Sequence, residues 1–165
     1  MAETGEPPLI RPARREDVGA LLELFAELAE YEHLTHELKA TEEGLAEALF
    51  GAEPVAYALI AEREGRALGY ALYFKTFSSF LTSTGIWLED LFVRPSVRGE
   101  GVGRALLAAV AREVVRAEGG RLEWAALDWN ELALGFYRNI GASTMSEWIS
   151  HRLDGSALRE LAASA

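Results

Sequence analysis

Apolar side chains recur every three or four positions in several stretches of the chain, which is the spacing of an amphipathic helix. The first stretch runs to about Tyr31 and follows Asp17, a residue type that favours helix N-caps. A second stretch begins after Thr41 and ends at Phe50, where Gly51 stops it. Further helices are predicted over about 101–118, 131–140 and 156–163.

Apolar runs between these helices predict strands at 9–13, 55–62, 67–77, 86–93, 122–127 and 147–153. The second and third of them are joined by a short turn that contains Gly65, which predicts a hairpin. Strands and helices alternate only in the second half of the chain. The predicted fold class is therefore α/β (α+β) with a mixed sheet, antiparallel at its N-terminal strands and parallel around 86–127. Residues 1–8 are expected to form a flexible tail, and 9–165 a single domain.

The amino-acid composition limits the kinds of molecule that the protein is expected to bind. The 165 residues carry a formal net charge of −10, which disfavours nucleic acid and anionic membranes and is compatible with a cationic substrate. No apolar run approaches the roughly 20 residues of a membrane helix. The chain has no cysteine, so disulfides, thiolate nucleophiles and zinc–thiolate sites are excluded, and a cytoplasmic location is expected. His33 and His36 could share a helix face with Glu32 and Glu37, but the third histidine is remote in the sequence and such acids are common on surfaces, so we expect no metal.

The segment between the strand at 86–93 and the helix at 101–118 is rich in glycine. It places glycines at 99, 101 and 103 between Arg98 and Arg104. Backbone amides at the start of a helix bind anions, and glycine lets a ligand approach them closely. A Walker loop would end in Gly-Lys-Ser/Thr, and a dinucleotide fingerprint would need glycine where Arg104 stands, so both are excluded.

Glu89 and Asp90 are adjacent carboxylates inside a strand that reads as buried on both faces. Because neighbouring strand residues face opposite sides, we expect one of them to line a cleft and the other to make a structural bond. A purely structural role for both is the alternative. A carboxylate beside a cleft can accept a proton from an ammonium group, directly or through water, and Glu89 is the candidate for this role. Asp90 is a weaker candidate, for binding a second positive charge of such a cationic substrate.

The order Arg98-x-x-Gly101-x-Gly103 resembles the cofactor signature of the GNAT acyltransferase superfamily. Leu-Glu-Asp at 88–90, Asp-Trp-Asn at 128–130 and Phe-Tyr at 136–137 follow in the order typical of its diamine, spermidine/spermine and thialysine N-acetyltransferase branch. The resemblance implies the GNAT fold, acetyl-CoA as co-substrate and a homodimer. It also implies a set of cofactor contacts: the backbone of Leu91, Phe92 and Val93 for the pantetheine arm, Arg98 with the amides of Gly99, Glu100, Gly101, Val102, Gly103 and Arg104 for the pyrophosphate, and Asn130 and Ala133 near the thioester.

Tyr137 lies in the Phe-Tyr pair and is the candidate acid, since a phenol within reach can protonate the departing thiolate. The expected reaction is direct attack of a small primary amine on acetyl-CoA, the amine being a polyamine, a diamine, thialysine or another amino-acid-like compound. Further candidates pair an acid with an aromatic ring and could form an amine channel, or else be ordinary core aromatics beside solvated acids: Tyr31, Glu32, Glu123, Trp124, Glu147 and Trp148. Acetylation of a protein or peptide, and a non-catalytic acyl-CoA-binding module, are the two alternative functions.

Overall fold

The computed structural model describes residues 6–164, so most of the tail expected at 1–8 lies outside the described residues. The chain forms two compact units, Met1–Ala125 and Ala126–Ala165. Each unit is described by itself below. The single domain expected over 9–165 stays a prediction.

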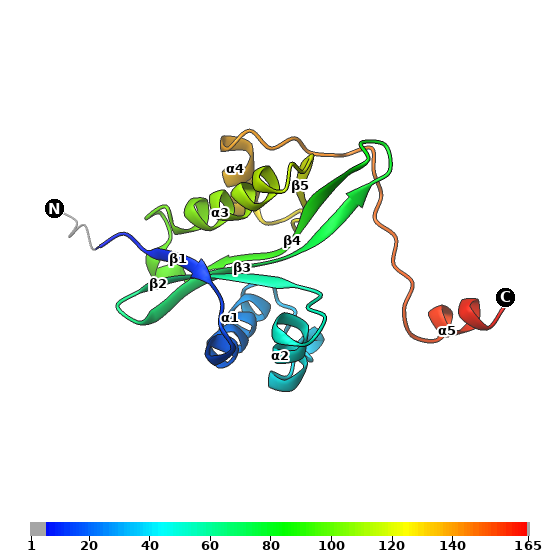
Figure 1. Cartoon of the computed structure of the whole chain (residues 1–165), viewed down its shortest axis with the longest axis horizontal. Helices are drawn as coiled ribbons and strands as arrows, with labels where there is room; N and C mark the ends of the chain where they lie inside the picture. The colour runs from blue at the N-terminus through cyan, green and yellow to red at the C-terminus, as the bar shows by residue number, and fades with distance from the viewer. Residues whose placement is uncertain (1–5, 165) are drawn as a thin grey trace. The chain divides into compact units, whose positions relative to one another are not determined.

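A mixed sheet forms the centre of the first unit (Figure 1). Its five strands lie in the order in which they occur in the chain: β1 Leu9–Pro12, β2 Tyr57–Arg63, β3 Arg66–Ser78, β4 Ser83–Val93 and β5 Arg121–Trp124. The first three pairings are antiparallel, and β4 pairs with β5 in parallel. The predicted mixed sheet, with its parallel pair around 86–127, is confirmed.

Helices cover the two faces of this sheet. Helices α1 (Val18–Tyr31) and α2 (Glu42–Phe50) pack on one face, and α3 (Val102–Arg116) covers the other (Figure 1). Short 3-10 turns occur at Arg15–Asp17, Thr35–Glu37 and Pro95–Val97. The predicted cap of α2 is confirmed, because the Thr41 hydroxyl accepts a hydrogen bond from the Gly44 amide at 3.1 Å.

Asp17 does not cap α1 with its side chain, contrary to the prediction. Its carboxylate instead accepts a hydrogen bond from the Arg14 amide and forms an ion pair of 2.6 Å with Arg11. Arg11 also pairs with Glu62, at 2.6 Å, so one guanidinium links β1, β2 and the turn before α1. The hydrogen bond from Arg11 lowers the pKa of Asp17.

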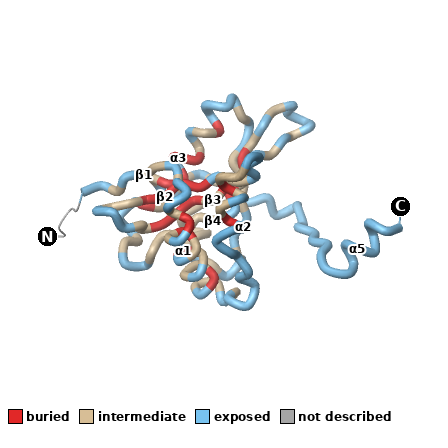
Figure 2. Tube along the Cα trace, turned by 60° about the horizontal axis from the view of Figure 1, so that its bottom comes forward, coloured by how far each residue is buried: buried red, intermediate tan, exposed pale blue. Residues whose placement is uncertain are grey.

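The buried residues gather along the sheet and along α1 and α3 (Figure 2). On α3 they recur at helical spacing, as the apolar stripe predicts. Burying one leucine of this kind stabilises the fold by roughly 1.5–3 kcal/mol. The largest fully buried side chains are Tyr70, Leu21, Leu24, Ile60, Leu88, Leu106, Val102 and Val110.

A β-bulge interrupts β4 at the acidic pair. Leu72 of β3 lies opposite Asp90, and the next residue, Tyr73, lies opposite Leu88, so Glu89 has no partner on β3. A bulge of this kind adds one residue to one strand and breaks the alternation of side chains. It decides which way the two carboxylates face.

The second unit contains α4 (Glu131–Asn139) and α5 (Gly155–Ala163). The predicted cap of α4 is confirmed, because the Asn130 side chain accepts a hydrogen bond from the Ala133 amide at 3.2 Å. The strand predicted at 147–153 is wrong: between the two helices of this unit the described backbone forms no strand. Apolar residues alone do not make a strand, because a strand also needs a neighbour to bond. Within residues 6–164, no helix is long and apolar enough to cross a membrane.

Candidate active site

The C-terminal half of β4 has one unpaired edge. Strand β5 pairs with Gly85–Leu88 and ends at Trp124. Within the described part of the first unit, Glu89 to Val93 therefore have a strand neighbour on the β3 side alone. An unpaired strand edge offers amide and carbonyl groups to an extended ligand. This is the edge that the resemblance assigns to the pantetheine arm, at Leu91, Phe92 and Val93.

The glycine-rich loop that follows β4 opens α3 in a conformation suited to an anion. Gly99 and Gly101 have φ values of 85° and 83°, which side chains rarely tolerate. No side chain caps the helix at Gly101, and the first turn closes with a bond of 2.9 Å from the Ala105 amide to the Gly101 carbonyl. The amides of Val102, Gly103 and Arg104 precede that bond, so they belong to the first turn whose N–H groups an α-helix leaves unpaired. The loop thus has the backbone of an anion site.

The charged side chains of this loop differ in their surroundings. Arg104 is exposed, whereas Arg98 is partly buried. The Arg98 guanidinium lies 4.5 Å from the centre of the Tyr31 ring, and its Nε donates to the Val93 carbonyl at 2.9 Å. Glu100 forms an ion pair of 2.9 Å with Arg63, which offsets one negative charge beside the predicted diphosphate site.

Glu89 and Asp90 lie on the same face of the sheet, contrary to the prediction. Leu88 pairs with Tyr73, and the charge of Glu113 on α3 acts on the Tyr73 hydroxyl, so both residues lie on the α3 face. The next residue, Glu89, therefore faces α1 and α2. Asp90 pairs with Leu72, which packs against the core cluster of α1 and α2. The bulge at Glu89 is the physical reason, since the extra residue cancels the expected alternation.

The two carboxylates have different environments on that face. Glu89 is exposed and accepts a hydrogen bond from the Trp87 indole at 2.9 Å. Asp90 is partly buried and accepts one from the Tyr70 hydroxyl at 3.1 Å. Burial raises the pKa of Asp90 to about 6; the Tyr70 bond opposes this shift, and the charges of Glu89 and Glu32 add to it. Burial also raises the pKa of Glu32, at the end of α1.

The sequence reasoning missed two residues that shape this site. Arg94 joins the end of β4 to α1 through bonds of 2.8 to 3.2 Å from its guanidinium to Glu27. Tyr70 supplies the donor to Asp90. A tyrosine inside a predicted core strand needs a partner for its hydroxyl, and a buried aspartate needs a hydrogen-bond donor. These two requirements, taken together, could have indicated the pair.

The remaining candidates are placed as follows. In the parallel register Glu123 lies beside Trp87, on the face of the acidic pair, and Trp124 lies beside Leu88, on the α3 face. Tyr31 and Glu32 lie at the end of α1. In the second unit, Tyr137 lies on α4, with its ring centre 5.4 Å from that of Phe136. Asn130 and Ala133 form the cap of the same helix. Glu147 and Trp148 are exposed.

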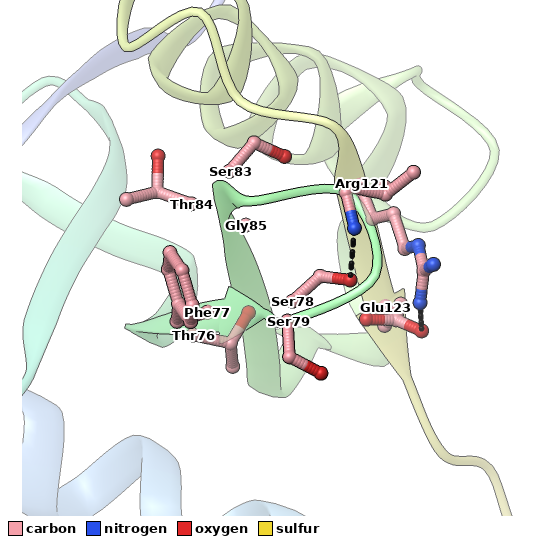
Figure 3. A pocket seen from close by; sticks show the side chains of 10 residues that line it. Thr76, Phe77, Ser78, Ser79, Ser83, Thr84, Gly85, Arg121 and Glu123 are labelled. Carbon is pink, nitrogen blue, oxygen red and sulfur yellow. Dashed lines mark hydrogen bonds and ion pairs between the residues drawn. The ribbon is translucent and has the colours of Figure 1, made fainter.

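A hollow of about 200 Å³ lies at the other end of β4, beside the β3–β4 hairpin (Figure 3). Polar groups from both strands line it, among them Ser78, whose hydroxyl accepts a hydrogen bond from the Leu81 amide at 3.2 Å. Arg121 and Glu123 approach each other there to 3.8 Å. Of the predicted site residues, this hollow includes Glu123 and neither member of the acidic pair.

The model of the acetyltransferase (GNAT) family matches residues 19–142, which is more than half of the chain. The protein therefore belongs to the GNAT family and is an acetyl-CoA-dependent N-acetyltransferase. The fold and the resemblance predicted from the sequence are confirmed.

Three individual proteins illustrate the similarity. A thialysine N-epsilon-acetyltransferase from Sus scrofa is 38% identical over 165 residues, covering 93% of this chain and 96% of that protein. An L-ornithine N5-acetyltransferase from Arabidopsis thaliana is 31% identical over 197 residues, covering 92% of this chain and 86% of that protein. Among solved structures, an integron cassette protein from the mobile metagenome of V. cholerae has a TM-score of 0.81 at 30% identity, covering 97% of this chain and all of that one.

Proposed function

We propose that the protein transfers the acetyl group of acetyl-CoA to a primary amine of a small molecule, such as a polyamine, a diamine, thialysine or a related amino acid. The observation that carries the proposal is the acidic face beside the unpaired edge of β4, where Glu89, Asp90 and Glu32 lie near one another. Such a face attracts an ammonium group. The names of the two relatives support the same class, since each enzyme acetylates a side-chain nitrogen of an amino acid.

The loop and the β4 edge fit the co-substrate. In this proposal the amides of Gly99–Arg104, together with Arg98, bind the diphosphate, the backbone of Leu91–Val93 pairs with the pantetheine arm, and Asn130 and Ala133 lie along it. The left-handed glycines support this role, because they turn successive amides toward one side. The bound thioester supplies an activated acetyl group.

In the proposed reaction, Glu89 accepts a proton from the ammonium group through a water molecule, and the freed amine nitrogen attacks the thioester carbonyl carbon. The carbon–sulfur bond then breaks as Tyr137 gives its proton to the departing sulfur. The attacking nitrogen, which is positively charged in the intermediate, loses its second proton to water as the amide forms, and Tyr137 regains a proton from solvent. Asp90 holds the cationic substrate. The exposure of Glu89 on the α1/α2 face supports its role, since a base must meet solvent or substrate.

A panel of amines tests the proposal. Release of free thiol from acetyl-CoA is measured with a monoamine, a diamine, a polyamine, ornithine, thialysine and a short peptide, and the acetylated product is identified by mass. We expect release with the small amines that carry a second polar group. Activity confined to the peptide would replace the proposal with protein acetylation, and binding of acetyl-CoA without release by any amine would leave it without support.

We also propose that the protein is a cytoplasmic homodimer, as the resemblance implies. Light scattering coupled to gel filtration tests the oligomeric state directly. A mass of one chain at micromolar concentration would contradict the dimer.

A further inference from the structure

Tyr70 carries a hydroxyl group in the interior of the first unit that the proposed chemistry does not use. The residue is 0% exposed, and its ring packs on Phe25 and Phe92 at centroid distances of 5.0 and 6.4 Å. A phenylalanine would fill the same space without burying a polar atom. Packing alone therefore does not account for the oxygen. Within residues 6–164 the hydroxyl donates its hydrogen bond to the Asp90 carboxylate, at 3.1 Å.

Asp90 lies among groups that repel its negative charge. Glu89 from its own strand and Glu32 from the end of α1 repel it, whereas the Tyr70 hydroxyl from β3 donates a hydrogen bond to it. Among the described residues no lysine or arginine forms an ion pair with it. Two neighbouring carboxylates favour rotation of the Asp90 side chain away from Glu89. The Tyr70 hydroxyl is the donor that opposes this rotation.

We propose that Tyr70 is a positioning residue for acetyl transfer: its hydroxyl fixes the Asp90 carboxylate beside Glu89, so that the two carboxylates together receive the ammonium group of the substrate. This inference rests on the proposed function, in which the amine reaches the α1/α2 face of β4. The bulge at Glu89 brings the two carboxylates to one face, and Tyr70 keeps the second of them in place. Tyr70 itself does not touch the substrate.

The test compares Tyr70→Phe with Tyr73→Phe, which removes a hydroxyl from the same strand on the opposite, α3-facing side of the sheet. Rates are measured against pH at saturating acetyl-CoA with the best amine of the panel. We expect Tyr70→Phe to lower kcat/KM for the amine about tenfold, mainly through KM, and to leave KM for acetyl-CoA unchanged. Loss of the donor also raises the pKa of Asp90 further, so the acid limb of the profile moves up by roughly one pH unit. Tyr73→Phe should behave like the wild type.

Asp90→Asn decides whether Tyr70 acts through Asp90. In the Asp90→Asn background, adding Tyr70→Phe should change neither kcat/KM nor the acid limb. An equal effect of Tyr70→Phe with and without Asp90, or equal effects of Tyr70→Phe and Tyr73→Phe, would show a merely structural role and overturn the proposal. An Asp90→Asn profile identical to that of the wild type would overturn it as well, even if Tyr70→Phe proved too unstable to assay.

A second readout needs no substrate, and it separates failure of this inference from failure of the proposed function. The carboxyl carbon of Asp90 is followed by ¹³C NMR against pH in the wild type and in Tyr70→Phe. We expect its midpoint to rise in the variant, whatever amine the enzyme uses. An unchanged midpoint would refute the link between the two side chains, while thiol release by the wild type would leave the proposed function standing.

Discussion

Replacing Asp90 with asparagine should stabilise the protein at neutral pH. Burial, together with the charges of Glu89 and Glu32, raises the pKa of Asp90 from 3.8 to about 6 in the folded state. A carboxyl group with a raised pKa contributes stability below its unfolded pKa, and that contribution is lost as the pH rises through the folded value. Ionisation of Asp90 in the folded protein therefore lowers the free energy of unfolding by about 3 kcal/mol at pH 8. The loss is roughly half as large at pH 5, where Asp90 is still mostly protonated in the folded state.

An asparagine carries no charge and keeps an acceptor for the Tyr70 hydroxyl. It must bury an amide group, however, and this cost offsets about 1 kcal/mol of the stability gained by removing the charge. We therefore expect Asp90→Asn to increase the free energy of unfolding by about 2 kcal/mol at pH 8, with a smaller gain at pH 5. Urea titrations followed by tryptophan fluorescence at both pH values measure the difference, and Glu53→Gln, at an exposed loop position, is the control. A variant less stable than the wild type at pH 8, or a difference that does not depend on pH, would refute this account of Asp90.

Three further predictions address the chemistry and the loop. Glu89→Gln should lower kcat at least about tenfold at neutral pH, and the loss should shrink toward high pH, where the amine arrives deprotonated; a loss that is constant across a pH series would contradict a role as base. Tyr137→Phe should lower turnover at least about tenfold while calorimetry shows nearly normal acetyl-CoA binding, and unchanged turnover would remove it from the mechanism. Gly101→Ala, at a φ of 83° with open space around the added carbon, should cost about 1 kcal/mol of stability and weaken acetyl-CoA binding several-fold. Gly19→Ala, in α1 with open space around it, should be neutral or stabilising, and equal effects of the two would refute the argument from backbone conformation.

Periodicity alone predicted most elements of the fold. The helical stripe that begins at Val102 and the cap at Thr41 are local features, and local features can be read from a single sequence. The strand expected at 147–153 was wrong. Its apolar residues satisfy a strand pattern, but strand formation depends on a neighbouring strand that the local pattern does not contain.

The roles of the candidate site residues stay predictions, but the geometry expected for the acidic pair was wrong. The run from Ile86 to Val93 reads as an uninterrupted strand, so the sequence placed Glu89 and Asp90 on opposite faces. The bulge arises from the pairing of β4 with β3, a contact between distant segments, and it reverses that conclusion. In the same way, the sequence shows that Arg98 borders the glycine-rich loop, but it does not show that the guanidinium of Arg98 lies over the ring of Tyr31.

A structure of the protein with coenzyme A and a non-reactive analogue of the best amine tests the central claim most directly. The account requires the diphosphate at the amides of Gly99–Arg104 and the amine nitrogen on the α1/α2 face of β4, within reach of Glu89. A diphosphate bound away from this loop, or an amine on the α3 face of the sheet, would contradict it.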